Sequence, residues 1–373
     1  MSASAAYLPR PIVILGPTAG GKSELAVELA QQLAAKTGTP GQILGADSMQ
    51  VYRHMEAGTA KPDAAQRARA VHHLIDIVEP TQRFTVANWI ALADELIVSL
   101  QSQSITPIIV GGTNLYLKAL LEGMFDGPAI NEALRDELGV LDIAKLRQRF
   151  EAIDPVAATR IHANDRKRMV RAIEVFEQTG KRISELQTQW EKPDAGDRVS
   201  GVGEAKLTSI QNGASHQKSE DEPPFSDTRH PTPDTRFSTY RHDPILVGMT
   251  WPVEKINARI NARVKEMFFP AACGVAPSAP ESLPAETARL ESLALLGPQA
   301  RKALGYQQVL DHLQSPSKIS LDDAMEQTKI LTRRFAKTQR TWLRRYRGVR
   351  WFEADAMTPK QIAAAVLDDM KNS

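Results

Sequence analysis

The sequence predicts an α/β fold in which a parallel sheet is flanked by helices and an all-helical lobe is inserted into this core. Five short apolar runs, each suited to a buried strand, lie at residues 11–15, 42–45, 74–78, 107–110 and 245–249. Helical patterns at 22–36, 86–101 and from 116 onward alternate with them, which is typical of parallel strands covered on both faces. The motif after the first run makes the predicted sheet P-loop NTPase-like.

That motif is a complete G-x-x-x-x-G-K-S phosphate loop. It consists of Gly16, Pro17, Thr18, Ala19, Gly20, Gly21, Lys22 and Ser23. Glycines let main-chain N–H groups close on phosphate oxygens, and the following helix N-terminus and Lys22 add positive charge. Ser23 is placed to meet a phosphate-bound Mg²⁺, the metal ion we expect. The alternative is a chance match in a glycine-containing turn, and the motif alone does not identify the phosphorylated ligand as a nucleotide.

The remaining patterns divide the chain into four parts. Residues 1–125 form the first part of the core, and 126–194 are helical and charged, with amphipathic stretches at 141–153 and 165–179. Asn164 or Asp165 is a plausible N-cap of the second stretch and Gly180 its C-cap. Residues 195–243 lack periodicity and predict a disordered insertion. Residues 244–373 continue the core, run helical to the end and include a second, shorter flexible segment at 271–286.

Composition excludes several classes of protein. The chain has 373 residues, a formal net charge of +2 and one cysteine, Cys273, so neither a disulfide framework nor a thiolate zinc cluster is expected. Its start resembles no signal peptide, and no apolar run approaches the length of a membrane span. We therefore expect a cytoplasmic protein that acts as a monomer, without a membrane partner.

Polar residues follow several of the predicted strands. Asp47 follows the second strand in the segment Asp47, Ser48, Met49, Gln50, and is either a general base or metal partner or a helix N-cap, with the two readings evenly weighted. Thr113 follows the glycine pair after the fourth strand, where close approach to a ligand and ordinary turn chemistry are both possible. Lys61 lies in a polar loop and either approaches the ligand or, as the simpler and favoured reading, is a solvated turn residue. Neighbouring His72 and His73 point to opposite strand faces and do not favour a metal site.

Basic residues gather in the helical lobe and near the end of the chain. Residues 166–171 hold four cations, and the segment 329–350 has no acidic residue. Arg333, Lys337, Arg340 and Arg344 form one helical stripe, while Leu331, Phe335, Thr338 and Trp342 are expected on an inward face. The stripe favours a polyanion such as nucleic acid over a capping helix paired with carboxylates. Two further arginines, Arg259 and Arg263, share a helix face and suit phosphate binding.

Jointly, these motifs resemble the tRNA dimethylallyltransferase (tRNA isopentenyltransferase) family of the bacterial type. The matching stretches occur in family order and cover most of the chain outside the two segments predicted to be flexible. They are GPTAGGKS, ADSMQVY, GTAKP, HHLIDIVEP, PIIVGGTNLYLKALLEG, DPVAATRIHANDRKRMVRAIEVFEQTGK, KALGYQ and RRFAKTQRTWLRR. The resemblance implies transfer of the dimethylallyl group from dimethylallyl diphosphate to N6 of the adenosine just 3′ of the tRNA anticodon (position 37), with release of diphosphate.

The resemblance also implies roles for individual residues. Asp47 is similar to the family's general base, and Thr18 to Ser23 are similar to its diphosphate cradle, with Mg²⁺ expected beside it. Thr113 and Arg263 are similar to further catalytic positions. Arg259 is a less certain neighbour of Arg263. The implied tRNA-contacting residues are Asp47, Ser48, Met49, Gln50, Thr113, Arg135, Lys167, Arg168, Met169, Val170, Arg171, Lys302, Ala303, Leu304, Gly305, Tyr306 and Gln307.

Three alternatives share parts of this pattern. A P-loop kinase of small metabolites needs the phosphate loop and the sheet but not the basic stripe. An RNA-binding ATPase needs both but leaves the RNA covalently unchanged. A prenyltransferase acting on free adenine nucleotide needs neither the basic stripe nor the helical lobe.

Overall fold

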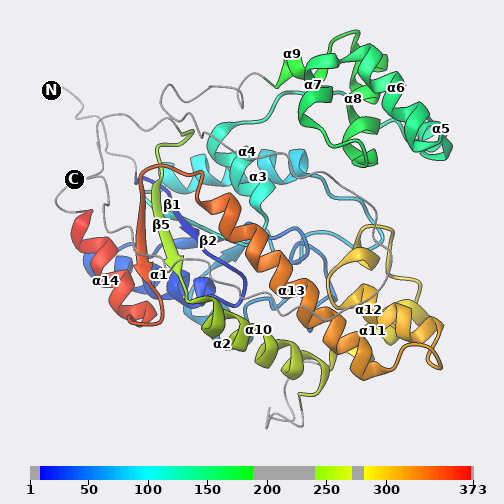
Figure 1. The fold of residues 1–373 in the computed structure, drawn as a ribbon. Helices are drawn as coiled ribbons and strands as arrows, with labels where there is room; N and C mark the ends of the chain where they lie inside the picture. Colours follow the sequence, from blue (N-terminus) through cyan, green and yellow to red (C-terminus); the bar gives the residue numbers. More distant parts are fainter. Residues whose placement is uncertain (1–8, 188–239, 271–280, 371–373) are drawn as a thin grey trace, which may run out of the picture. The chain divides into compact units, whose positions relative to one another are not determined.

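The computed structural model describes residues 9–187, 240–270 and 281–370, and its centre is a six-stranded parallel sheet. The strands are β1 (Ile12–Leu15), β2 (Gln42–Gly45), β3 (His72–His73), β4 (Pro107–Val110), β5 (Ile245–Thr250) and β6 (Val349–Glu353). Their order is β3-β2-β4-β1-β5-β6, and all five pairings are parallel. Figure 1 labels β1, β2 and β5 of this sheet. The predicted parallel α/β fold is therefore confirmed.

Alternate residues of the strands enter two different apolar cores, because successive side chains of a strand point to opposite faces. In β1, Ile12 and Ile14 pack into one core, and Val13 and Leu15 pack into the other; all four are 0% exposed. Burial on both faces explains why this strand is wholly apolar and not alternating in sequence.

Helices cover each face of the sheet. One core is closed by α1 (Lys22–Thr37) and α14 (Pro359–Asp369), which lie side by side in Figure 1. The other is closed by α3 (Val86–Ser102), α4 (Asn114–Glu122), α10 (Val253–Phe268), α11 (Leu283–Ser292), α12 (Tyr306–Gln314) and α13 (Leu321–Leu343). The short α2 (Ala64–Arg69) and the 3-10 helix η3 (Ala300–Lys302) complete this unit.

Two strand predictions were wrong in detail. The run at residues 74–78 does not form the third strand: β3 ends at His73, because Leu74 and Asp76 adopt φ of +61° and +57°, and only an isolated bridge joins Tyr52 to Val78. The C-terminal region also contains β6, although the sequence predicted helix to the end. Helix α13 ends at Leu343, and Gly348, with φ +67°, allows the chain to turn into this edge strand.

The predicted flexible segments also begin or end elsewhere. Residues 188–239 and 271–280, which hold most of both predictions, lie outside the described part of the chain. Before β5, however, Arg241 and His242 contact Asp94 of α3 at 2.6 and 2.8 Å. Glu286, expected in the second segment, is 1% exposed within α11. Residues 240–243 and 281–286 thus belong to the folded core, because specific polar contacts hold them there.

The helical lobe is a separate compact unit, Phe125–Asp234, described over residues 125–187. It contains α5 (Glu132–Val140), α6 (Ile143–Ile153), α7 (Pro155–Arg160), α8 (Arg166–Thr179) and α9 (Ile183–Leu186) around its own apolar cluster. The predicted caps of α8 are confirmed: Asp165 accepts a hydrogen bond from the Arg168 N–H, and Gly180 adopts φ +68°. The other unit comprises Met1–Met124 and Thr235–Ser373.

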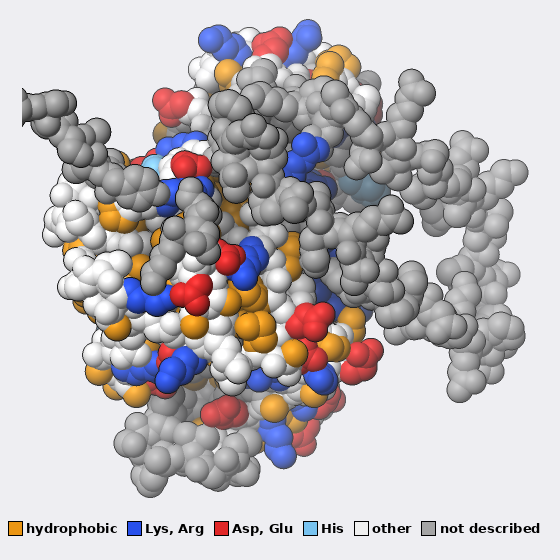
Figure 2. Space-filling model, turned by 90° about the vertical axis from the view of Figure 1, so that its left-hand side faces the viewer, with side chains coloured by type: hydrophobic (Ala, Val, Ile, Leu, Met, Phe, Trp, Pro, Cys, Tyr) orange, Lys and Arg blue, Asp and Glu red, His pale blue; other side chains and the backbone are white. Residues whose placement is uncertain are grey.

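Charge is mixed on the face of the molecule in Figure 2, where Lys and Arg side chains lie among Asp and Glu side chains. This mixture agrees with the small net charge of the whole chain. No helix in the described residues combines the length and apolar character that crossing a membrane requires.

Candidate active site

A cavity of about 960 Å³ opens in the unit that contains the sheet, beside the carboxyl ends of β1, β2 and β4. Ligands of open α/β sheets bind at this edge, because loops that leave adjacent strands converge there. Many of the residues singled out in the sequence line the cavity. They are Thr18, Ala19, Gly20, Gly21, Lys22, Ser23, Asp47, Ser48, Met49, Gln50, Thr113, Arg263, Lys302, Ala303, Leu304 and Gly305.

The phosphate loop joins β1 to α1 in the conformation that its glycines permit. Gly21 adopts φ +87°, and a Cβ on Gly20 would lie 2.8 Å from the carbonyl oxygen of Pro17. Arg259 and Trp251 hold the outside of the loop: Arg259 Nε donates to the Ala19 carbonyl at 2.8 Å, and Trp251 Nε1 donates to the Gly20 carbonyl at 3.0 Å. These contacts explain how Ala19, a residue with a side chain, keeps its φ of +59°.

Two cations face the cavity in an unfavourable environment. Burial and the nearby charge of Arg263 lower the pKa of Lys22 to about 8, against a smaller opposing effect of Asp47. Burial also lowers the pKa of Arg263. In this structure Lys22 Nζ donates to the Pro17 carbonyl at 2.8 Å, and Arg263 Nη1 lies 3.5 Å from Thr18 Oγ1. An anion bound at the loop would relieve both charges, because it would replace the lost solvation.

Asp47 lies in a turn after β2, where Oδ1 accepts hydrogen bonds from the N–H groups of Met49 and Gln50 at 2.9 and 3.4 Å. No helix begins here, so the helix N-cap reading was wrong, although the carboxylate does cap its own turn. The residue is only partly buried and lines the cavity. The geometry therefore leaves the general-base reading open.

Thr113 fixes the position of this turn. Its hydroxyl accepts a hydrogen bond from the Ser48 N–H at 2.9 Å, and its own N–H donates to the Ala46 carbonyl at 3.1 Å. Gly111 must be a glycine, since a Cβ there would lie 2.0 Å from the Ala46 carbonyl oxygen. The turns after β2 and β4 are thus in direct contact.

Sequence reasoning missed Gln339, which lies on α13 among the basic residues. Its side chain is 0% exposed, and it hydrogen-bonds both the Thr18 N–H and the Gly112 carbonyl at 2.8 Å. An uncharged residue in a strongly basic stretch was the available signal. The inward face of α13 was predicted only in part: Leu331 and Trp342 are half-buried, but Phe335 and Thr338 are exposed. Ala336, Gln339 and Leu343 are buried instead.

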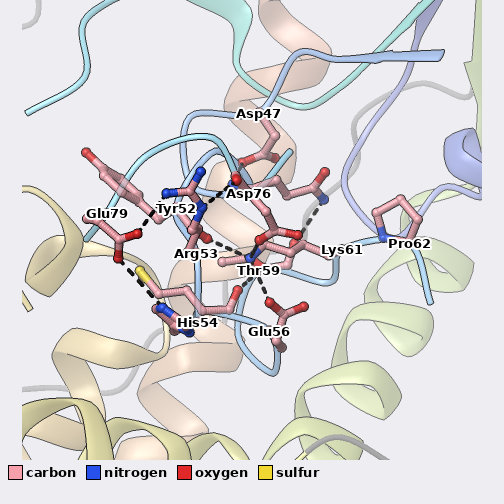
Figure 3. Close-up of polar contacts among 12 residues, drawn as sticks. Asp47, Tyr52, Arg53, His54, Glu56, Thr59, Lys61, Pro62, Asp76 and Glu79 are labelled. Carbon is pink, nitrogen blue, oxygen red and sulfur yellow. Dashed lines mark hydrogen bonds and ion pairs between the residues drawn. The ribbon is translucent and has the colours of Figure 1, made fainter. Parts of the chain in front are cut away.

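Lys61 is not a solvated turn residue. Its ammonium group contacts Asp76, Glu56 at 2.9 Å and the Tyr52 carbonyl at 2.6 Å, and its side chain is 1% exposed. Figure 3 shows these contacts together with the neighbouring ion pair of Arg53 and Glu79. Lys61 therefore has a structural role in the loop that lines one side of the cavity, because the carboxylates of Glu56 and Asp76 neutralise its charge.

Gln50 and Tyr306 bind further parts of the same loop. Gln50 Nε2 donates to the carbonyls of Thr59 and Ala60 at 3.1 and 3.0 Å. The Tyr306 hydroxyl accepts a hydrogen bond from the Gly58 N–H of this loop at 3.2 Å and donates one to Glu286 at 2.6 Å, and its ring is 0% exposed. The ring of Tyr306, an implied tRNA-contacting residue, therefore cannot stack on a base, whereas Lys302 is exposed and can reach a ligand.

The predicted tRNA-contacting residues of the helical unit divide into three kinds. Lys167 and Arg168 are exposed, whereas Met169 and Val170 are buried in the unit's core. Arg135 and Arg171 both bind the fully buried Glu174, each with a contact of 2.8 Å or less. A contact between a tRNA and this stretch is therefore expected to come mainly from Lys167 and Arg168.

For a metal ion, the described residues contain no group of three or more His, Cys, Asp or Glu side chains that could hold one. Ser23 does line the cavity at the N-terminus of α1. This donor set fits Mg²⁺ bound mainly through phosphate and water, with a single protein hydroxyl.

Comparison with known proteins gives a consistent result. The sequence model described as IPP transferase matches residues 50–346. A tRNA dimethylallyltransferase of Geobacter sulfurreducens is 35% identical over 350 residues, which cover 92% of each chain. A tRNA dimethylallyltransferase 2 of Geotalea daltonii is 34% identical over 355 residues, covering 92% of this chain and 88% of its own.

Solved structures are similar over nearly the full length. The tRNA isopentenylpyrophosphate transferase of Bacillus halodurans has a TM-score of 0.60 and 28% identity, with 97% of this chain and 96% of that chain covered. A eukaryotic dimethylallyltransferase acting on tRNA has a TM-score of 0.69 with coverage of 98% and 80%. At 22% identity, the second likeness supports the fold alone.

Proposed function

Because this chain belongs to the IPP transferase family, and is accordingly a tRNA prenyltransferase, we propose that it transfers a dimethylallyl group from dimethylallyl diphosphate to N6 of the adenosine 3′-adjacent to the anticodon. The observation that carries the finer proposal is the shared cavity, which is lined by the phosphate loop on one side and by Asp47 and Thr113 on another. A diphosphate donor and an adenine acceptor can meet there.

In the proposed reaction, the bond between C1 of the prenyl group and the diphosphate oxygen breaks while the bond from N6 to C1 forms. The N6 proton passes to the Asp47 carboxylate, which makes the weakly nucleophilic amine a better nucleophile. Diphosphate leaves with the bonding electron pair. The acceptor base must leave its stack to reach the cavity, as in base flipping.

Lys22, Arg263 and the N–H groups at the start of α1 stabilise the negative charge that grows on the leaving diphosphate. Their stabilisation is strongest in the transition state, where this charge develops. A Mg²⁺ ion held in part by Ser23 would add further neutralisation of the same charge. The phosphate loop thus serves a leaving group and not an energy source.

We further propose that the enzyme acts as a cytoplasmic monomer and that its tRNA-contacting residues lie within the stretches 47–50, 167–171 and 302–307, in particular the exposed side chains of Lys167, Arg168 and Lys302. The basic helix α13 supports a polyanionic substrate, since Arg334, Lys337 and Arg344 are exposed on it or at its end.

The test is mass spectrometry of an unmodified tRNA after reaction with the purified protein, dimethylallyl diphosphate and Mg²⁺. The proposal predicts a gain of one five-carbon prenyl unit on the adenosine next to the anticodon. Phosphorylation of a small acceptor by ATP would favour a kinase instead, and RNA-stimulated ATP hydrolysis without change in the RNA would favour an ATPase. Prenylation of free adenine nucleotide but not of tRNA would support the proposed prenyl transfer but would identify the free nucleotide as the acceptor.

A further inference from the structure

Gln339 bridges two loops of the active site that lie far apart in the sequence. Its Oε1 accepts a hydrogen bond from the Thr18 N–H, and its Nε2 donates one to the Gly112 carbonyl, both at 2.8 Å. The identity of the partners fixes the orientation of the amide, because a peptide N–H only donates and a carbonyl only accepts. The side chain therefore joins the phosphate loop to the turn after β4 in one defined arrangement.

From Gly112 the connection continues to Asp47. The next residue, Thr113, holds the turn after β2 through the Ala46 carbonyl and the Ser48 N–H. A Cβ placed on Gly112 would lie 2.8 Å from Gln339 Nε2 and 3.6 Å from Asp47 Oδ2, so these groups are close neighbours. Hydrogen bonds, joined by peptide bonds between neighbouring residues, thus link the side of the cavity that bears the proposed general base to the side that bears the phosphate loop.

The cost of this arrangement argues against a role in packing alone. A buried amide is unfavourable unless its polar atoms are paired, and an apolar side chain would fill a helix–loop contact more simply. Gln339 is 0% exposed, and its amide hydrogen-bonds main-chain groups of the two loops. These partners are the groups whose spacing matters for transfer.

We propose that Gln339 is a positioning residue for prenyl transfer: it sets the distance between the phosphate loop and the Asp47–Thr113 turns, and so between donor and acceptor. The inference rests on the proposed function, since it assumes that the two substrates meet in this cavity. Transfer requires C1 and N6 to approach in line, and a displacement of about 1 Å can cost on the order of 100-fold in rate. Loss of the bridge should therefore slow the reaction more than it weakens the binding of either substrate.

The first variant is Gln339→Leu, which removes both hydrogen bonds with little change in volume. We expect the turnover number for prenyl transfer to fall about 10- to 100-fold. The dissociation constants of inorganic pyrophosphate and of tRNA should stay within about threefold of wild type, because the binding groups themselves remain. A merely structural role would not produce this split between turnover and binding.

The chain offers a matched control in Gln299. This half-buried glutamine also bridges a main-chain N–H and a carbonyl, those of Phe84, at 3.3 and 2.9 Å, but it does not line the cavity. Gln299→Leu should leave turnover unchanged, even if it lowers the melting temperature as much as Gln339→Leu does.

If the Gln339→Leu variant does not fold, two further variants still test the proposal. Gln339→Asn keeps the amide but is one methylene shorter, so it cannot reach both partners and should also slow turnover. Gly112→Ala would displace Gln339 Nε2 from its present position. Combined with Gln339→Asn it should slow transfer no more than the slower single variant, since both changes break the same bridge.

Two results would overturn the proposal: a folded Gln339 variant with wild-type turnover, or a loss of turnover matched by an equal loss of pyrophosphate affinity. The second would make Gln339 part of the phosphate site itself. Failure of the proposed function would look different, because the wild-type protein would then bind pyrophosphate without prenylating any tRNA.

Discussion

Two clusters of charged side chains, one in each unit, differ in how their buried charges are neutralised. In the helical unit, Arg135 and Arg171 surround the buried Glu174, and their hydrogen bonds hold its pKa below the ordinary value although burial opposes this. In the cavity, Lys22 and Arg263 have lowered pKa values, and among the described residues neither forms an ion pair. The buried charge of the first cluster is paired within the protein, whereas the cations of the second cluster gain an oppositely charged partner only when an anion binds.

The difference between the clusters separates structural from functional cations. An arginine that saturates a buried carboxylate contributes to folding, because removal of either partner leaves the other unpaired. A buried cation whose charged form is disfavoured is a cost to folding, and such costs are usual at functional sites. Matched substitutions in the two units can break or sharpen this distinction.

The strongest test replaces one carboxylate of each unit by its amide. Asp47→Asn should lower the turnover number by about 10²- to 10⁴-fold, because it removes the proposed base and leaves the shape unchanged. Glu174→Gln should leave turnover at saturating tRNA nearly unchanged and lower the free energy of unfolding by about 1–3 kcal/mol, because it weakens hydrogen bonds to charged groups. Steady-state kinetics and urea denaturation of both variants give the comparison. Near-normal turnover of Asp47→Asn would remove Asp47 as the base.

Arg263→Met separates the two clusters in the same way for cations. Loss of a positive group beside the leaving diphosphate should slow transfer by about 10²- to 10³-fold. The stability of the protein without ligand should not fall, since the variant removes a half-buried charge that has no ion-pair partner in the described residues. Arg135→Met, the control, should do the reverse, with lower stability and little change in turnover. A destabilised Arg263→Met would place that arginine with the structural class.

The lowered pKa of Lys22 predicts a pH dependence of ligand binding. With a pKa of about 8 in the free protein, Lys22 is protonated at pH 7 and progressively loses its charge above pH 8. An anion binds the protonated form better, so pyrophosphate affinity should fall as pH rises through this value, by up to about tenfold per pH unit. Calorimetry from pH 7 to 9.5 on the wild type and on Lys22→Arg tests this, because titration of pyrophosphate itself is common to both. Identical pH profiles would contradict the prediction.

The sequence was most informative where a local motif determines the structure. The phosphate loop and the caps of α8 follow from glycine conformation and helix-end hydrogen bonding, which depend on neighbouring residues. The family resemblance assigned Asp47 and Thr113 to one site, and the structure confirms that both residues line the same cavity.

What escaped the sequence depends on contacts between distant segments. Gln339 reaches Thr18 across 321 positions, and its uncharged side chain in a basic stretch does not by itself identify partners so far away in the sequence. Lys61 was predicted to be an exposed turn residue, because its partner Asp76 was assigned to the third strand. In the structure Asp76 lies in a loop, where it pairs with Lys61. Tyr306 was expected to contact tRNA, because its hydroxyl partner Glu286 lies in a segment predicted to be flexible.

The smallest expected effect concerns the helical unit and shows which of its cations remain for tRNA. Lys167 and Arg168 are exposed, and the contact of Arg168 with Asp165, at 3.3 Å, is a surface ion pair of little energetic weight. The variant Lys167→Ala with Arg168→Ala should weaken tRNA binding and reduce the slope of log K against log salt by about 1–2, roughly one for each phosphate that is no longer neutralised. Lys145→Ala with Arg149→Ala removes the same charge from α6 and should leave the slope as it is. If both pairs reduce the slope equally, the effect belongs to overall charge, and residues 167 and 168 then have no particular place in tRNA recognition.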